Sequence, residues 1–515
     1  MDNNVGRVES VRSEICIVTG LKGMGLSNVV AFSSGATGIV LGFEREKAQV
    51  VMLEAYDKVK KGDLVRVIAE HPTISVSEKL LGRVIDPLGR PLDGHGDIET
   101  LDAVKLPIET EARPIYQRAL VDKPLQTGYI LIDSQIPIGL GQRELLLGER
   151  KSGQVEIAID AICNQAKLDT GVICIYVAID SEASVTKRNV ERLKKDGALG
   201  QTVVVFGRTA SAASLNYITP MVGMTIAEWF MAQGKHVLIV FDDLTRHAKV
   251  YRQMSLLLNR PASREAYPGD IFYLHSRLLE RCGAFNEHAN YGTITALPIV
   301  ETTTEEVTDY ITTNLMSITD GHVLFKRSLA NKGLRPPIDS GFSVSRIGGR
   351  IQPKFIRSLS DQLKDILTRF AEIERFIAFG TDLNSESLEI YDVGLRTREL
   401  IDQSSDDYFT PLQQAMLLYF LTSKAALDWE PAQMRELRTQ LFEFMNRAPY
   451  NKLITPELLK AYDETTIHPF AECIQDFKRD PATLKPIDKT NRLVAETETI
   501  SGILRENQEM FSDKN

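Results

Sequence analysis

The middle of the chain contains continuous apolar runs that alternate with segments of helical periodicity. The runs are rich in β-branched residues and show no alternation of apolar and polar side chains, as expected for strands buried on both faces of a parallel sheet. They are RELLLG (from Arg143), VICIYVAI (from Val172), QTVVVFG (from Gln201) and HVLIVFDD (from His236). Between them, VEIAIDAICNQA and MTIAEWFMAQG carry apolar residues at helical spacing. The pattern predicts βαβ units.

The segments on either side of this region have different patterns. Up to about Ser77, short apolar runs are separated by Gly, Ser and charged turns, which predicts the closely spaced strands of a small barrel. After Gln352, apolar residues recur every three or four positions and predict amphipathic helices. We therefore predict a multidomain chain with an N-terminal β-barrel at residues 1–77, a central α/β domain with a parallel sheet at 78–352 and a C-terminal α-helical domain at 353–515.

Composition excludes some classes of function. The 515 residues carry a formal net charge of −9, so binding to nucleic acid through bulk positive charge is disfavoured. No run approaches the roughly 20 apolar residues that cross a bilayer. The cysteines are too widely spaced for a disulfide framework or a metal knuckle. We therefore expect no nucleic-acid partner and no metal site built from protein ligands alone.

A glycine loop joins the first apolar run of the central region to the helix that follows. It reads Gly148-Glu149-Arg150-Lys151-Ser152-Gly153-Gln154-Val155, with its glycines five positions apart. In this context of strand, loop and helix, backbone N–H groups can surround a phosphate at the helix N-terminus. The central domain therefore has the pattern of a P-loop NTPase of the RecA-like type, and the loop is its candidate nucleotide-binding site.

Two positions of the loop depart from a working phosphate site. A P-loop places Lys on the β- and γ-phosphates and Ser or Thr on Mg²⁺, but this chain has Gln154 and Val155 there. Glutamine can donate a hydrogen bond but brings no charge, and valine has no oxygen for a metal. We predict either a degenerate loop kept for packing or a loop that binds nucleotide weakly.

The apolar run HVLIVFDD ends in the second candidate element of such a site. In P-loop NTPases an acid at this strand end holds Mg²⁺, usually through water, and Asp242 stands at that position. Paired carboxylates could equally cap the helix that begins after Asp243. The metal interpretation and the capping interpretation both remain open.

Long blocks of the chain resemble the alpha subunit of the rotary F-type ATP synthase. The resemblance covers nearly the whole chain. The blocks are LLGRVIDPLGRPLDG (from Leu80), QTGYILIDSQIPIGLGQRELLLG (from Gln126), FDDLTRHAKVYRQMSLLLNRP (from Phe241), REAYPGDIFYLHSRLLER (from Arg264), SITDGH (from Ser317) and GFSVSRIGG (from Gly341).

The resemblance implies a ring in which alpha-like chains alternate with catalytic beta subunits around a central shaft. It implies ATP or ADP with Mg²⁺ at the interface with beta and a membrane rotor reached through partners. It also implies coupling to proton transport and a position on the cytoplasmic, matrix or stromal face of a coupling membrane. In this family the alpha subunit sends an arginine into the catalytic site of beta, and the matching residue is Arg346. A guanidinium beside a transferring phosphoryl group stabilises transition-state charge.

Other family positions follow from the same blocks. Ser343 and Ser345 would orient the loop of Arg346, because serine hydroxyls bond to nearby backbone in turns. Asp320 and Arg335 match positions near the subunit interface, where charge pairs could fix geometry. In the region that contacts adenine, where the family has glutamines, the chain retains Gln403 but has Leu395 and Ser405 at other positions, which weakens the case for nucleotide binding.

The chain departs from the family pattern in three ways. Alpha subunits usually keep the Lys and Thr that Gln154 and Val155 replace. Ser181 stands where alpha subunits carry glutamine and beta subunits carry the glutamate that polarises water, so a general base is missing. The chain begins almost at the first barrel strand, without the N-terminal helix that grips the stator in this family, and we expect its stator contact to differ.

Two other functions are compatible with a ring-forming chain of this kind. A ring-forming secretion-type ATPase would need its own intact P-loop and base, which Gln154 and Ser181 argue against. A purely structural ring spacer would need no arginine finger, which Arg346 in its intact motif argues against.

Overall fold

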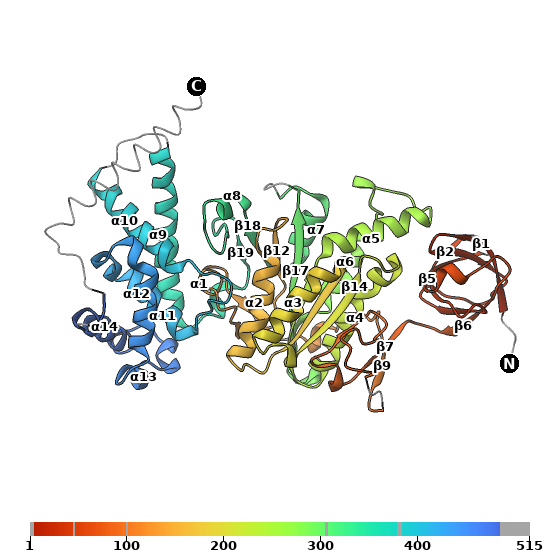
Figure 1. The fold of residues 1–515 in the computed structure, drawn as a ribbon, viewed down its shortest axis with the longest axis horizontal. Helices are drawn as coiled ribbons and strands as arrows, with labels where there is room; N and C mark the ends of the chain where they lie inside the picture. The colour runs from red at the N-terminus through yellow and green to blue at the C-terminus, as the bar shows by residue number, and fades with distance from the viewer. Residues whose placement is uncertain are drawn as a thin grey trace, which may run out of the picture. The chain divides into compact units, whose positions relative to one another are not determined.

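A computed structural model describes residues 5–44, 47–98, 101–303, 307–378, 384–480 and 482–484. The described chain packs into two compact units (Figure 1). The first unit draws on residues 1–125, 138–329 and 337–347, and the second on residues 126–137, 330–336 and 348–515.

The first unit begins with a closed six-stranded barrel, as the short apolar runs predict. The strand order is β1-β2-β5-β4-β3-β6. The strands are β1 Val5–Arg12, β2 Ile15–Thr19, β3 Val29–Phe32, β4 Thr37–Glu44, β5 Lys47–Glu54 and β6 Leu64–Ala69. Strand β5 is buried on both sides: Val50 and Met52 pack inside the barrel, whereas Val51 and Leu53 join the core of the α/β region. This double burial explains why its sequence does not alternate.

The rest of the first unit is built on a nine-stranded sheet. Along the sheet the order is β19-β18-β12-β17-β15-β13-β14-β8, with β16 paired to β17. All neighbours are parallel except β19 on β18 and β16 on β17. The strands are β8 Val84–Ile85, β12 Glu144–Glu149, β13 Ile173–Ser181, β14 Thr202–Arg208, β15 His236–Asp242, β16 Gly283–Ala284, β17 Thr293–Thr302, β18 Gly321–Phe325 and β19 Val344–Ser345. The four predicted runs are therefore strands, and the predicted parallel sheet is confirmed.

Helices and short elements complete the first unit. The helices are α2 Gln154–Lys167, α3 Ala183–Lys195, α4 Ala213–Ala232, α5 Leu244–Leu257, α6 Ile271–Glu280, α7 Tyr310–Ile318 and α8 Arg327–Asn331. The short strands are β7 Thr73–Val76, which pairs with β9 Val104–Pro107, and β10 Pro124–Leu125, which pairs with β11 Ile138–Gly139. The two sequence segments with helical spacing lie in helices α2 and α4.

The second unit is helical, as the sequence predicts beyond Gln352. Its helices are α1 Ile130–Gln135, α9 Lys354–Ala378, α10 Ser385–Ile401, α11 Pro411–Thr422, α12 Met434–Met445, α13 Tyr450–Leu453 and α14 Glu464–Arg479. Thr410 closes a capping box at the start of α11, with Pro411 at the first helical position. Helix α1 comes from the middle of the sequence, and its buried Asp133 accepts a hydrogen bond from Gln414 at 2.7 Å.

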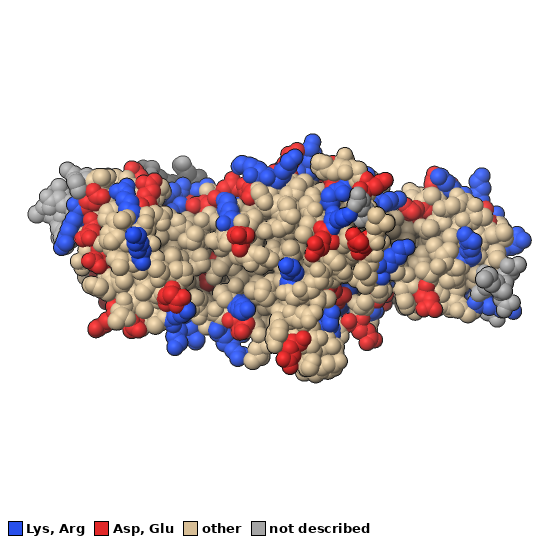
Figure 2. Space-filling view, turned by 90° about the horizontal axis from the view of Figure 1, so that it is seen from below, with Lys and Arg blue, Asp and Glu red and all other residues tan. Residues whose placement is uncertain are grey.

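The surface carries both signs of charge. On the face in Figure 2, basic and acidic side chains are interspersed. Within the described ranges, no helix combines the length and the apolar character needed to cross a membrane.

Candidate functional site

The glycine loop lies between β12 and α2, as predicted. Gly153 precedes α2 with φ 107°, and Lys151 has φ 64°, so both adopt left-handed backbone conformations. At Gly148, an added Cβ would lie 2.5 Å from the carbonyl oxygen of Phe325 on the neighbouring strand, so only glycine fits. Since the first N–H groups of a helix have no partner within the helix, this end of α2 can attract an anion.

The polar side chains of the loop turn back onto its own backbone. The Ser152 hydroxyl donates to the carbonyl of Glu149 at 2.7 Å, and the Gln154 amide donates to the same carbonyl at 3.1 Å. Ser152 and Gln154 are 2% and 3% exposed, whereas Arg150 and Lys151 are exposed to solvent. Position 154 therefore stabilises the loop itself, where a P-loop lysine would contact phosphate.

Asp242 and Asp243 end β15 at the same edge of the sheet, and both are fully buried. The Tyr176 hydroxyl donates to Asp242 at 2.6 Å, and the Arg246 guanidinium lies 3.3 Å from its other carboxylate oxygen. Asp243 caps α5 by accepting from the N–H of Arg246 at 2.7 Å, and it also pairs with the guanidinium. Burial raises the pKa of Asp243 to about 7, which the Arg246 charge opposes.

Ser181 stands where the family resemblance places the base of a catalytic subunit, and its exposed neighbour Glu182 is the N-cap residue of α3. Ser181 ends β13, is buried, and accepts a hydrogen bond from Thr186 at 3.1 Å. Its neighbour Asp180 is half-buried with φ 46°, and burial raises its pKa. The described residues include no group of three or more His, Cys, Asp or Glu side chains that could hold a metal ion.

Gln403 lies in the second unit, where its amide is used in packing. Its side-chain oxygen accepts from the N–H of Ile130 at 2.7 Å, and its nitrogen donates to the carbonyls of Gly128 at 2.9 Å and Asp407 at 2.7 Å. Gln403 is 1% exposed. These bonds join the segment around α1 to the end of α10.

Arg346 follows the short strand β19 and is exposed. Its backbone N–H donates to the carbonyl of Asp320 at 2.9 Å, which fixes the main chain at this point. Within the described ranges, no carboxylate forms an ion pair with its guanidinium. The Ser343 hydroxyl accepts from the N–H of Leu324 at 2.9 Å and donates to the carbonyl of Asp339 at 2.7 Å. Ser343 therefore holds the loop to β18.

The structure supplies the partners that the sequence could not give for Asp320 and Arg335. The Asp320 carboxylate takes a two-pronged ion pair from Arg143 at 2.7 and 3.0 Å. In the second unit, Arg335 pairs with Asp402 at 3.0 Å. Arg143 stands directly before β12, the strand that leads into the glycine loop. Through Asp320, whose carbonyl binds the backbone of Arg346, it also supports the loop that carries this arginine.

The glycine loop and Arg346 lie at opposite ends of the parallel strands. We call these two ends of the sheet the glycine-loop edge and the arginine edge. Glu144 pairs with Gly321, which in turn pairs with Ser345 beside Arg346, whereas Glu149 at the other end of β12 enters the loop. Five residues of strand separate these ends, or roughly 16 Å at about 3.3 Å per residue. The backbone at Arg346 is therefore far from the chain's own loop.

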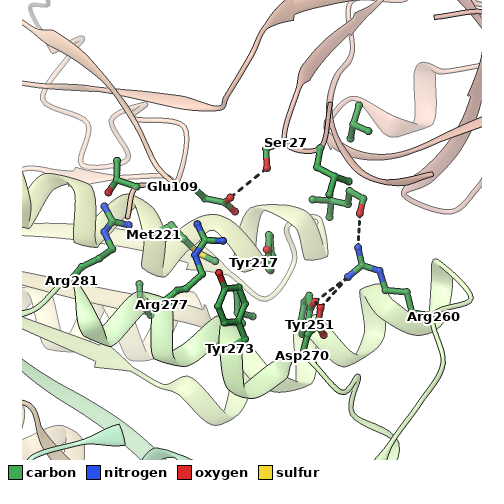
Figure 3. Close-up of a pocket in the computed structure, with 16 residues that line it drawn as sticks. Ser27, Glu109, Tyr217, Met221, Tyr251, Arg260, Asp270, Tyr273, Arg277 and Arg281 are labelled. Atoms are coloured by element: carbon green, nitrogen blue, oxygen red, sulfur yellow. Dashed lines mark hydrogen bonds and ion pairs between the residues drawn. The ribbon is translucent and has the colours of Figure 1, made fainter. Parts of the chain in front are cut away.

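A cavity of about 220 Å³ lies between the barrel and the helices α4, α5 and α6 (Figure 3). Tyr251 donates to Asp270 at 2.7 Å and accepts from Arg260 at 3.0 Å on one side of it. The side chains of Arg277 and Arg281 lie on the other side. No local sequence signal marks this cavity, because the barrel and the helices build it jointly from distant segments.

Comparisons with known proteins agree with this architecture. Residues 128–345 match the nucleotide-binding domain of the ATP synthase alpha/beta family, and residues 352–477 match the C-terminal domain of the ATP synthase alpha/beta chain. ATP synthase subunit alpha of Staphylococcus epidermidis is 41% identical over 481 residues, covering 92% of this chain and 93% of that protein. The subunit alpha of Caldanaerobacter subterraneus subsp. tengcongensis is 43% identical over 444 residues, covering 86% of this chain and 87% of that protein. The chain belongs to the ATP synthase alpha/beta family, on the side of its alpha subunits.

Proposed function

We propose that this chain is a non-catalytic alpha subunit of a rotary F-type ATP synthase or ATPase, and that Arg346 completes the catalytic sites of adjacent beta subunits. The observation that carries this proposal is the placement of Arg346: it is exposed, has no ion-pair partner among the described residues, and follows a strand at the sheet edge opposite the chain's own loop. An arginine so placed is available to a neighbouring chain.

The chemistry asked of Arg346 is charge stabilisation. As a phosphoryl group is transferred, negative charge spreads over its equatorial oxygens, and a planar guanidinium can donate two hydrogen bonds to them. Such a finger supplied by a neighbouring subunit contributes about 10³–10⁵ in rate. Ser343 supports this role because its hydroxyl binds the backbone of Leu324 in β18 and the carbonyl of Asp339, which fixes the loop.

The chain's own loop is proposed to be degenerate. Gln154 is committed to the Glu149 carbonyl, and Val155 has no oxygen to offer Mg²⁺. Asp242 could reach a metal only through water, and Tyr176 and Arg246 already engage its two oxygens. These residues do not fit a tightly held Mg-ATP, so no catalytic step is assigned to this loop. ATP or ADP with Mg²⁺ would instead bind at the interface with beta, where beta supplies the metal ligands.

The partners follow from this role. We propose an alternating ring with three beta subunits around a gamma-like shaft, attached to a membrane rotor at the cytoplasmic, matrix or stromal face of a coupling membrane. In this arrangement turnover at the beta sites is coupled to rotation and to proton transport. The relatives named above carry the name ATP synthase subunit alpha, which supports this assembly.

The deciding experiment is ATP hydrolysis by the chain co-expressed with its beta partner. Arg346→Ala is expected to lower kcat by about 10³-fold or more with the ring still assembled, because the transition state loses its guanidinium. Arg350→Ala is the matched control, since Arg350 is an exposed arginine four residues further on. Unchanged turnover in the Arg346→Ala ring would instead favour a purely structural spacer.

A further inference from the structure

Three consecutive residues before and at the start of β12 reach the loop that carries Arg346. Arg143 holds Asp320, whose carbonyl accepts from the backbone of Arg346. Gln142 and Glu144 lie on either side of Arg143 and are both fully buried. None of the nucleotide chemistry described above uses Gln142 or Glu144.

The Gln142 side chain links the start of β12 to the loop by three hydrogen bonds. Its oxygen accepts from the N–H of Gly139 at 2.8 Å, which sets the orientation of the amide. Its nitrogen donates to the Glu144 carboxyl at 2.6 Å and to the Ser345 hydroxyl at 3.0 Å. Since the amide donates both ways, the position of Ser345 depends on how Gln142 is held.

The Glu144 carboxyl helps to hold the Gln142 amide in place. An added Cβ on Gly321 would lie 2.4 and 2.7 Å from the two Glu144 oxygens, so the carboxyl is packed tightly under the strand that pairs with Ser345. Only one of these oxygens has a hydrogen-bond partner among the described residues. Burial raises the pKa of Glu144 well above its ordinary value, and the hydrogen bond from Gln142 opposes this shift.

We propose that Gln142, oriented by Glu144, is a positioning residue that fixes the direction of Arg346 through Ser345. The inference rests on the proposed role of Arg346 and adds to it the residues that aim the guanidinium. Displacement of a catalytic group by about 1 Å can cost about 100-fold in rate, so a buried bond one residue away has a measurable effect.

The test is a double-mutant cycle in the co-expressed ring with beta. Gln142→Leu is expected to lower kcat for ATP hydrolysis by about 10- to 100-fold with little change in KM, because the transition state loses an aligned guanidinium. In the Arg346→Ala background the same substitution should have no further effect, since it acts only through Arg346. Glu144→Gln, which keeps an acceptor for Gln142, should retain most of the turnover that Glu144→Leu loses.

Thr295→Val is the matched control. Thr295 is buried and accepts from the N–H of Gly141 at 2.8 Å, so it supports the same turn without reaching Ser345. Its kcat should stay within about twofold of the parent. If Gln142→Leu prevents assembly, Ser345→Ala removes only the accepting hydroxyl and should lower kcat by about 3- to 10-fold.

The outcomes separate the two proposals. Full turnover in both the Gln142→Leu and Ser345→Ala rings, or losses that multiply with that of Arg346→Ala, would overturn the positioning role alone. Unchanged turnover on Arg346→Ala would overturn the finger and the positioning role together.

Discussion

The two edges of the central sheet treat their functional side chains in opposite ways. At the glycine-loop edge, Ser152 and Gln154 fold back onto the Glu149 carbonyl, and Arg246 lies against Asp242 and Asp243. At the other edge, the Asp320 carbonyl fixes the backbone of Arg346, whereas its exposed side chain has only a long hydrogen bond to the Met316 carbonyl at 3.5 Å.

The difference shows that a glycine loop can keep its backbone shape while its side chains take other partners. The glycine spacing and the following helix persist in this chain, but Ser152 and Gln154 bond to the Glu149 carbonyl of the same loop. The arginine edge differs, since the exposed Arg346 guanidinium has one long hydrogen bond, to the Met316 carbonyl at 3.5 Å, and no ion pair among the described residues. An exposed charge of this kind costs little in water. Substitutions at one edge at a time can test this contrast.

The largest expected effect belongs to the arginine edge. Arg346→Lys keeps the charge but loses the planar fork that bonds phosphoryl oxygens in pairs. In the ring with beta we expect kcat to fall by at least about 100-fold, as when one oriented donor is removed from a transition state. Arg350→Lys serves as control. Full turnover with lysine would show that charge alone suffices and would weaken the contrast between the edges.

A second substitution tests whether the glycine loop can regain the residues of a working P-loop. The double substitution Gln154→Lys with Val155→Thr returns a cation and a hydroxyl to the positions that contact phosphate and Mg²⁺. Because bonds to charged groups contribute about 1.5–3 kcal/mol each, affinity for Mg-ATP should rise by at least about 10-fold. Equilibrium binding to the chain with and without Mg²⁺ measures this. No gain would locate the defect in the base-binding region instead.

The smallest effect concerns pH at the loop edge. Burial raises the pKa of Asp243 to about 7 from 3.8, so the folded chain holds a proton that the unfolded chain releases. Its contribution to stability is therefore present below about pH 4 and is lost as the pH rises to about 7. Asp243→Asn keeps the acceptor that caps α5 but cannot titrate.

We expect the substitution to reduce the difference in melting temperature between pH 5 and pH 8 by roughly a few degrees. The measurement is thermal unfolding of parent and variant at both values. A parent that gains stability over this interval while the variant does not would contradict the sign.

Secondary structure could be predicted well because its signals are local. The unalternating runs became β12, β13, β14 and β15, since a strand buried on both faces needs apolar side chains at every position. Two similar Thr-Pro pairs behave differently as helix starts. Thr410 caps α11 through its side chain, but Thr455 precedes a 3-10 helix at Pro456–Lys460 without a side-chain cap. The domain boundaries at 77 and 352 stay predictions.

By itself, the sequence determined the order of barrel, sheet and helices, the glycine loop and its missing lysine, and the arginine motif. Each of these depends on residues close together in the chain. Only the tertiary structure decided which partners the polar side chains take: Gln154 turns to Glu149, Arg143 reaches Asp320, and Gln142 reaches Ser345. The physical reason is that a buried polar group must find a partner wherever the fold brings one, and sequence distance does not limit that choice.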